Sequence, residues 1–154
     1  MNIFDEFPKL INHIERENLS YAIVGGVALA FHATPRFTQD IDILIFLEDI
    51  DRLKLMLSDE GFSESTRPWT FKNVNMTLHR FIKIDGEDIF QLDIITANEE
   101  KSRQIIKDAL KAESEHGTIR VAAKKDLIWM KRQRNSDQDK VDIKSLKAAE
   151  NEEN

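Results

Sequence analysis

Apolar residues recur along this chain with two periods, one typical of helices and one typical of strands. Apolar residues at helical spacing predict helices at about residues 4–18, 27–33, 50–61, 98–110, 123–134 and 137–149. Short runs rich in β-branched and aliphatic residues predict strands at 21–24, 40–47, 70–77, 78–84, 88–96 and 118–121. Strands and helices therefore alternate through most of the chain.

Turn and cap signals give the predicted elements their boundaries. Thr34-Pro35 closes the second helix, because proline cannot continue a helix. Asn98 is a candidate N-cap for the helix that follows it. Asp85-Gly86 between two strand patterns is typical of a β-hairpin. Because a hairpin pairs antiparallel strands, the fold class predicted is α/β with a mixed sheet and helices packed against it.

Composition limits the domain organisation and the classes of site. Only five glycines and three prolines occur among 154 residues, so we expect one domain over residues 1–150, followed by a polar tail at 151–154. The absence of cysteine excludes disulfide scaffolds, zinc–thiolate sites and thiol nucleophiles. The net charge of -6 counts against a surface that is basic all over, as a general nucleic-acid grip would be.

No targeting or membrane signal is expected in this chain. The first ten residues, MNIFDEFPKL, lack the basic and apolar regions of a secretory signal. The longest apolar runs, such as Ile43–Leu47, are far shorter than the roughly 18 residues of a membrane span. We therefore expect a cytoplasmic protein without a membrane partner.

A glycine pair, Gly25-Gly26, lies between a predicted strand and a predicted helix. Glycines at such a point let the backbone approach a ligand closely, and the helix N-terminus that follows favours phosphate. The alternative is a tight strand-to-helix turn without a ligand. The third glycine of the dinucleotide fingerprint and the Gly-Lys-Ser/Thr of the phosphate loop are both absent, which disfavours those two nucleotide folds.

Two aspartates, Asp40 and Asp42, lie in the predicted strand 40–47. Side chains alternate in a strand, so both carboxylates project from the same face. At ~5 Å and an effective dielectric of ~20, their repulsion is roughly 3 kcal/mol. A divalent cation with oxygen ligands would compensate it. The alternatives are an exposed edge strand or an ion pair with the nearby Arg36.

A third acid, Asp93, stands within another apolar strand pattern. If its strand neighbours strand 40–47, three carboxylates converge and can hold two metal ions. Two metals about 3.5–4 Å apart can clamp the attacking and leaving oxygens of a phosphoryl or nucleotidyl transfer. The alternative for Asp93 is a simple ion pair with a lysine.

Together these residues carry a resemblance to a known family. Gly25-Gly26, a spacer of thirteen residues, Asp40-Ile41-Asp42 and a later Asp93 resemble the nucleotidyltransferase superfamily related to DNA polymerase β. Gly26 stands where many members have serine, which removes one hydroxyl contact to the phosphates. The resemblance spans about residues 20–146.

Two further segments resemble the branch that includes AbiEii-type and MenA-type bacterial toxins. One is residues 36–42, and the other is the C-terminal pattern formed by 125–131, Arg134 and 139–143. Members of that branch are usually longer and have a helical region beyond the core. This chain is close to the minimal core.

The resemblance implies a reaction and a set of roles. The phosphates of an NTP would lie over Gly25-Gly26, with Mg²⁺ or Mn²⁺ held by the acids named above. The acid nearest the attacking hydroxyl, Asp93, would assist its deprotonation. Lys131 matches a lysine that contacts the triphosphate in related members. Arg36 either contacts phosphate or neutralises the acids of strand 40–47.

The acceptor hydroxyl could belong to RNA such as tRNA, to a protein, or to a small molecule such as an aminoglycoside. A toxin would also have an antitoxin partner that restrains it. Two other readings stay open. One is a non-catalytic nucleotide-binding or interaction module on the same fold, and the other is an α/β domain whose acids are all structural.

Several other polar residues have structural expectations. The four histidines show no metal-ligand spacing, and His79 is expected to be a hydrogen-bonded structural residue. Asp139 and Asp142 share one helix face and are expected to contact Lys131 or Arg134. A basic cluster near the C-terminus either steers a nucleic-acid acceptor or, as the favoured reading, forms a solvated helix face: Arg120, Lys124, Lys125, Lys131, Arg132 and Arg134.

Overall fold

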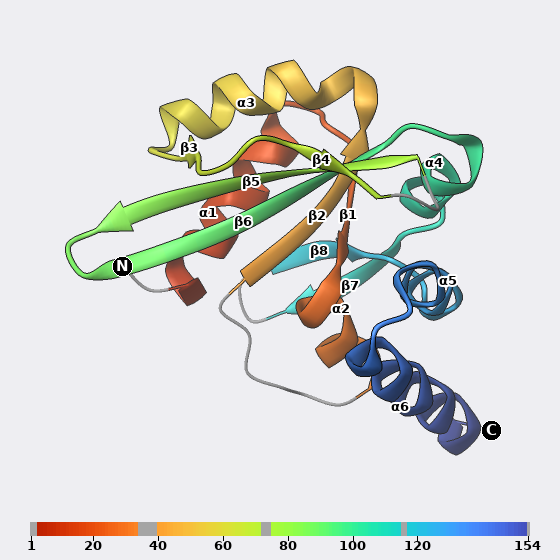
Figure 1. Cartoon of the computed structure of the whole chain (residues 1–154). Coiled ribbons are helices and arrows are strands. Elements are labelled where there is room, and N and C mark those ends of the chain that lie inside the picture. Colours follow the sequence, from red (N-terminus) through yellow and green to blue (C-terminus); the bar gives the residue numbers. More distant parts are fainter. Residues whose placement is uncertain (1–2, 34–39, 72–74, 115–116, 154) are drawn as a thin grey trace.

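The computed structural model describes residues 3–33, 40–71, 75–114 and 117–153, with backbone only for 3–5, 114 and 149–153. Within these ranges the chain forms one mixed sheet with helices around it (Figure 1). The strands are β1 Tyr21–Val24, β2 Asp40–Phe46, β3 Ser63–Glu64, β4 Trp69–Thr70, β5 Met76–Asp85, β6 Asp88–Ala97, β7 Leu110–Ser114 and β8 Gly117–Val121. The helices are α1 Ile3–Arg16, α2 Gly25–His32, the short 3-10 turn η1 Leu47–Asp49, α3 Ile50–Asp59, α4 Glu100–Lys107, α5 Lys124–Arg134 and α6 Asp137–Glu153.

The sheet runs in the order β3-β5-β6-β2-β1-β8-β7, and β4 pairs with the outer part of β5. β2 lies at its centre, antiparallel to β1 and parallel to β6. β5 and β6 form the hairpin that Asp85-Gly86 predicted, and it extends beyond the rest of the sheet (Figure 1). The predicted α/β fold with a mixed sheet is confirmed.

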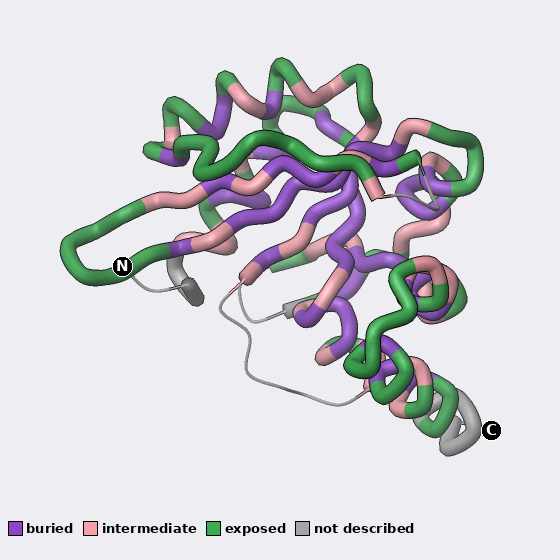
Figure 2. The backbone as a smooth tube through the Cα atoms, in the orientation of Figure 1, coloured by how far each residue is buried: buried purple, intermediate pink, exposed green. Residues whose placement is uncertain are grey.

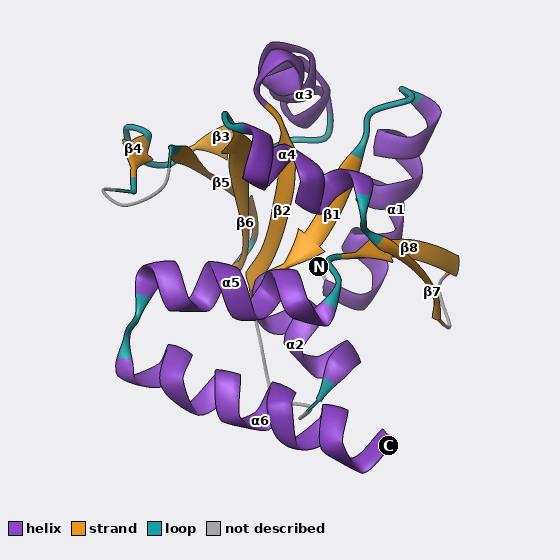
Figure 3. Ribbon diagram, turned by 90° about the vertical axis from the view of Figure 1, so that its right-hand side faces the viewer, coloured by secondary structure: helices purple, strands orange, loops and turns teal. Residues whose placement is uncertain are grey.

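Helices α1 and α3 cover one face of the sheet. Both make contacts that tie them there: His13 of α1 bonds Glu60 just after α3 at 2.6 Å, and Glu6 of α1 accepts a hydrogen bond from Lys83 of β5 at 3.0 Å. The other face is covered only in part, by α4 at one end and by α5 at the other, with α6 alongside α5 (Figure 3). An open stretch of this face remains between them.

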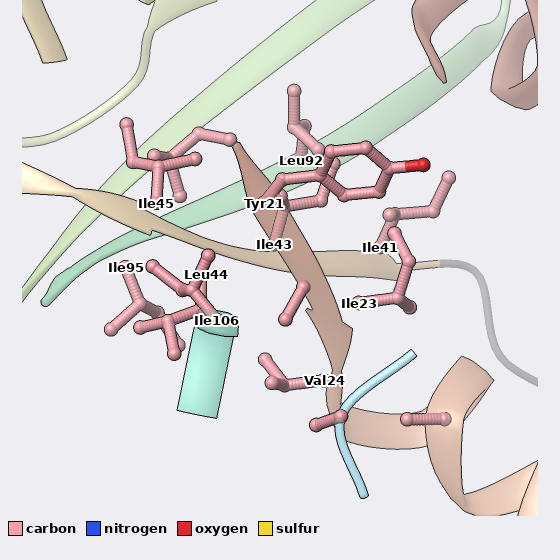
Figure 4. Close-up of a cluster of buried hydrophobic side chains, with 14 of the residues drawn as sticks. Tyr21, Ile23, Val24, Ile41, Ile43, Leu44, Ile45, Leu92, Ile95 and Ile106 are labelled. Atoms are coloured by element: carbon pink, nitrogen blue, oxygen red, sulfur yellow. The ribbon is translucent and has the colours of Figure 1, made fainter. Parts of the chain in front are cut away.

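The hydrophobic core lies on both sides of the central strands. On one face Tyr21, Ile23, Ile41 and Ile43 are almost completely buried (Figure 4). On the other face α4 packs its Ile106 against the β2 and β6 side chains (Figure 4). Figure 2 shows that burial is greatest in these strands and falls toward the hairpin tip and the outer helix surfaces. The continuous apolar run of β2 is explained by its burial from both sides.

Most predicted elements are confirmed, but the strand predicted at 70–77 is wrong. Only Trp69–Thr70 is a strand in that part, and β5 begins at Met76. The backbone N–H of Phe71 donates to the carbonyl of Met76 at 3.0 Å, so the chain reverses here and β4 returns antiparallel to β5. A turn that carries apolar residues cannot be told from a strand by periodicity.

The region around residues 98–110 also differs from the prediction. The helix begins after Glu99, whose N–H donates to Ser102 Oγ, so Asn98 is not the cap. It ends at Lys107, and Leu110 starts the edge strand β7, which was not predicted. The exposed two-residue strand β3 was also not predicted. Such short, polar strands are determined by their partners and leave little pattern in the sequence.

Three further findings concern the ends of elements. Helix α6 continues to Glu153, through most of the predicted polar tail at 151–154. The predicted stop signal Thr34-Pro35 lies outside the described residues. Over the described part of the chain, no helix has the length and apolar character needed to cross a bilayer.

Candidate active site

The three aspartates singled out from the sequence meet on the partly uncovered face of the sheet. Asp42 of β2 lies directly beside Asp93 of β6 in the parallel register, and Asp40 is paired with Gln91. Neighbouring strands lie ~4.8 Å apart, and paired residues point the same way. Because β2 is central, the alternative of an exposed edge-strand pair is wrong.

The glycine pair lies at the end of β1, next to these acids. Val24 pairs with Asp42, and α2 begins at Gly25 with no intervening loop. Gly25 has φ +68°, and a Cβ there would clash with the carboxylate of Asp42. Glycine is therefore required at Gly25 both for its backbone conformation and for the close approach of the carboxylate. Both glycines line the same cavity as the acids.

Arg80 of β5 holds Asp93, and this pairing was not predicted from the sequence. Arg80 Nε donates to Oδ1 of Asp93 at 2.9 Å, and its second terminal nitrogen donates to Oδ2 at 3.1 Å. The guanidinium also lies 5.2 Å from the ring centre of Trp69. The expected alternative of an ion pair at Asp93 is thus found, with arginine in place of lysine.

The acids of β2 have raised pKa values. Burial, followed by the charges of Asp93 and Asp40, raises the pKa of Asp42 to about 7. Burial and then the charge of Asp93 raise the pKa of Asp40, and Arg80 opposes this. Asp42 thus carries a full negative charge at neutral pH only at a cost in free energy. A cation bound between these carboxylates would remove that cost.

Helices α5 and α6 supply two cations to the cavity, and both are ion-paired. Lys131 is buried, and its Nζ donates to Asp142 at 2.9 Å and lies 3.9 Å from Asp139. Arg134 makes two hydrogen bonds to Asp139, at 2.9 and 2.7 Å. The expected structural contacts of Asp139 and Asp142 are confirmed, and Lys131 does not lie on a solvated helix face.

Asp139 shows how strongly this part of the site is organised. It is fully buried, and it also accepts hydrogen bonds from Ser136 N and Oγ at 3.0 and 2.6 Å. Burial acts to raise the pKa of Asp139, but the hydrogen bonds from Arg134 and Ser136 outweigh it and lower the pKa to about 2. The carboxylate that anchors α6 to α5 therefore stays ionised.

The donor set fits a hard divalent cation in part. In the portions of the chain that the structure describes, no three carboxylate or imidazole side chains are arranged to hold a metal ion. Both oxygens of Asp93 bind Arg80, so Asp40 and Asp42 are the acids placed to offer oxygen ligands. Mg²⁺ commonly takes one or two carboxylates and completes its shell with water and phosphate, which suits this pair. The three-carboxylate site stays a prediction.

The cavity has a volume of about 520 Å³, within the usual range of small-ligand sites. It joins the glycine pair and the acids to α5 on one side and to β4 and β5 on the other. Its described lining is Val24, Gly25, Gly26, Asp40, Asp42, Trp69, Phe71, Met76, Leu78, Arg80, Asp93, Ile95, Leu127, Met130, Lys131, Gln133 and Arg134. Arg36, the remaining predicted site residue, lies outside the described residues.

His79 lies on the opposite face of the sheet from Arg80. Its Nδ1 is buried without a hydrogen-bond partner among the described residues, so the expectation of a hydrogen bond is wrong for that atom. Burial and the charge of Lys54 lower the pKa of His79, which keeps the ring neutral. His79 is therefore separated from the cavity.

Comparison with solved structures identifies the fold. A Thermotoga maritima protein described as a nucleotidyltransferase superposes with a TM-score of 0.65 at 16% identity, over 90% of this chain and 89% of that one. The lincomycin-bound lincosamide adenylyltransferase LnuA gives 0.61 at 15% identity, over 94% and 96%. The antibiotic-resistance factor ANT(2'')-Ia gives 0.62 at 16% identity, over 97% and 84%. In sequence, the chain matches no protein-family model and no curated protein.

These superpositions cover nearly the whole of each chain, so the fold of this protein is that of the nucleotidyltransferases. Identities of this size establish the fold and not the activity. The resemblance first suggested by the glycine pair and the aspartates therefore holds at the level of the fold. The closer likeness to AbiEii-type and MenA-type toxins stays a prediction.

Proposed function

We propose that this protein transfers a nucleoside monophosphate from an NTP to a hydroxyl group of an acceptor. The observation that carries the proposal is the meeting of Asp40, Asp42 and Asp93 on one face of a cavity that ends at Gly25-Gly26. Acids that repel each other raise the free energy of a fold unless a ligand compensates them. The nucleotidyltransferase fold supports the same reading.

The phosphate end of the cavity would lie at the start of α2. Gly25-Gly26 bring backbone N–H groups and the positive end of the helix to the cavity without a side chain in between. Lys131 and Arg134 of α5 line the same end. Each is held by a carboxylate of α6, so their positions are fixed before the nucleotide arrives.

Asp40 and Asp42 would hold a divalent cation, Mg²⁺ or Mn²⁺, together with the NTP phosphates. When bound, that cation supplies positive charge to the phosphoryl oxygens. The two residues contribute oxygen ligands from one face of a rigid central strand. Gly25 keeps the carboxylate of Asp42 in place by leaving room for it.

Asp93 would accept the proton of the attacking hydroxyl. The acceptor oxygen forms a bond to the α-phosphorus, the bond from that phosphorus to the bridging oxygen breaks, and pyrophosphate leaves. Each carboxylate oxygen of Asp93 already accepts one hydrogen bond from Arg80, and a carboxylate oxygen can accept two. Arg80 is thus a positioning residue that fixes the direction in which Asp93 faces.

The acceptor class is the least constrained part of the proposal. Two proteins of the same fold are named as an adenylyltransferase of lincosamides and as a factor whose complex holds adenylyl-2''-tobramycin, both small hydroxyl compounds. We therefore place a small molecule first. RNA, a protein hydroxyl and an antitoxin partner remain the predictions of the toxin-like reading. A non-catalytic nucleotide-binding module is the alternative function.

The test uses the purified chain with Mg²⁺ and each α-³²P-labelled NTP in turn, against small hydroxyl compounds, total tRNA and cell extract. We expect label transfer and pyrophosphate release, both abolished in Asp42→Asn, which keeps the shape of the side chain. The matched control is Glu87→Gln, an exposed acid in the β5–β6 turn. Equal transfer by wild type and Asp42→Asn would refute the mechanism.

Nucleotide binding separates the two functions on the same fold. At a hundred times its dissociation constant, MgATP stabilises the folded state by ~2.7 kcal/mol, which raises the Tm of a chain of this size by roughly 5–10 °C. Stabilisation without transfer to any acceptor would support the non-catalytic module. No stabilisation by any NTP would contradict both.

A further inference from the structure

The cavity continues past Asp93 into an apolar wall. The wall is made by residues of β4, β5 and β6 that line the cavity: Trp69, Phe71, Met76, Leu78 and Ile95. Trp69 pairs with Leu78, and Phe71 bonds Met76, so these side chains share the face of the sheet that carries Arg80. We refer to these five residues as the apolar wall.

The sheet order places the apolar wall opposite the phosphate end. From Gly25 at the end of β1, the strands follow as β2, β6, β5 and β4. At ~4.8 Å per strand, β4 lies about 19 Å from β1. Asp93, the acid that faces the attacking hydroxyl, comes before the wall in this order. The body of the acceptor, and not the phosphates, therefore falls on the wall.

The charges of the described lining limit what the wall can bind. Each of its three cations is paired: Arg80 with Asp93, Lys131 with Asp142, and Arg134 with Asp139. An RNA backbone needs cations that are not already paired, and a polycationic acceptor needs acids beyond those that Arg80 and the metal would take. The described lining beyond Asp93 is apolar instead.

Trp69 is the part of the wall that is most ready for a ligand. It keeps 39% of its surface exposed although it lines the cavity, and its ring already packs against the Arg80 guanidinium at 5.2 Å. An aromatic ring fixed in this way offers a flat surface to an aromatic or apolar group. Stacking against it would also bring the ligand over the residue that holds Asp93.

We propose that the apolar wall binds the aromatic or apolar part of a small hydroxyl-bearing acceptor. The inference rests on the proposed function, since it takes the direction of attack from it. It names the class of acceptor: an amphipathic small molecule such as an aryl glycoside, with its hydroxyl toward Asp93 and its apolar part on Trp69.

The test compares two probes that differ only in the apolar group, 4-nitrophenyl β-D-glucoside and methyl β-D-glucoside. Binding is measured by saturation-transfer NMR and by equilibrium dialysis. We expect the aryl glycoside to bind at least tenfold more tightly. Trp69→Ala should remove that advantage, and Trp69→Phe should restore most of it. Phe31→Ala removes an aromatic side chain that is 50% exposed on α2, outside the described cavity lining, and serves as the control.

Three results would overturn the inference. They are equal binding of the two glycosides, unchanged binding of the aryl glycoside by Trp69→Ala with an unaltered unfolding midpoint, and tighter binding of tRNA or tobramycin that survives Trp69→Ala. MgATP binding by the wild type is measured separately. Failure of MgATP to bind refutes the proposed function, whereas a preference for the aryl group that depends on Trp69 is read independently of it.

Discussion

Replacing Arg80 by glutamine gives the most direct test of how the site is held together. Arg80 makes two hydrogen bonds to Asp93, whose side chain is only 6% exposed, whereas that of Arg80 is 33% exposed. Glutamine keeps much of the length of the side chain but removes the charge. The variant therefore leaves a buried carboxylate beside Asp40 and Asp42 without its cation.

The size of the effect follows from this geometry. Two charges ~4 Å apart interact by about 4 kcal/mol at an effective dielectric of ~20, and removing one partner of a fully buried pair costs about 3–5 kcal/mol. Because a third of Arg80 is in water, we expect a smaller loss, about 3 kcal/mol, which lowers the Tm by roughly 6–12 °C. The raised pKa of Asp42 should rise further, since Arg80 no longer offsets the charge of Asp93.

The matched control is Arg103→Gln. Arg103 also makes two hydrogen bonds to one carboxylate, that of Glu48, at 2.7 and 2.8 Å, and its side chain is 30% exposed. Glu48, however, is 56% exposed. Urea unfolding followed by circular dichroism at pH 7 should show a much smaller change for Arg103→Gln than for Arg80→Gln. The difference between the two variants measures the burial of Asp93.

A double-mutant cycle decides whether the effect belongs to this ion pair. Adding Asp93→Asn to Arg80→Gln removes the unpaired charge, so the double variant should regain most of the lost stability. A coupling energy below ~0.5 kcal/mol would refute the reasoning, because distant, independent substitutions add to within about that amount.

Three other substitutions test the rest of the site. Gly25→Ala forces alanine to φ +68° and into the neighbouring β2 carboxylate, so thermal unfolding should show a larger loss than the ~1–2 kcal/mol expected for Gly86→Ala, which has φ +62° in open space. Lys131→Met leaves Asp142 buried without its cation and should cost about 3 kcal/mol in urea unfolding, with no recovery at high salt. Asp139 has its pKa lowered to about 2 from 3.8, so it stabilises the fold by about 2 kcal/mol above pH ~4, and this is lost as the pH falls toward 2; in Asp139→Asn, acid unfolding should lack that step.

The sequence was sufficient to predict the acids of the site and their common face. Alternation in a strand places Asp40 and Asp42 together, and burial of β2 from both sides appears as an uninterrupted apolar run. The parallel pairing that brings Asp93 beside Asp42 could only be expected, because the order of strands in a sheet leaves no local pattern. Long-range pairing is what the periodicity of a single segment cannot supply.

Arg80 was within reach of sequence reasoning and was missed. The predicted Asp85-Gly86 hairpin fixes the register of its two strands, since Asp85 pairs with Asp88. Five residues back from the turn on each strand are Arg80 and Asp93. The burial of Lys131 was not predictable in the same way, because it depends on how α6 packs against α5. A basic run in a helix has the same pattern whether its lysines face water or a neighbouring helix.

The distribution of charge in the cavity explains why the acids of β2 differ from the other buried acids. Asp139 and Asp42 are both influenced by Arg134, yet the pKa of Asp139 is lowered to about 2 while that of Asp42 is raised to about 7. Arg134 and Lys131 bind the acids of α6 directly and act on Asp42 only from a distance. If charge pairing served stability alone, these cations would lie against the central strand. Instead they fix α6 to α5 and leave Asp42 under-compensated, which is the electrostatic condition for binding a cation there.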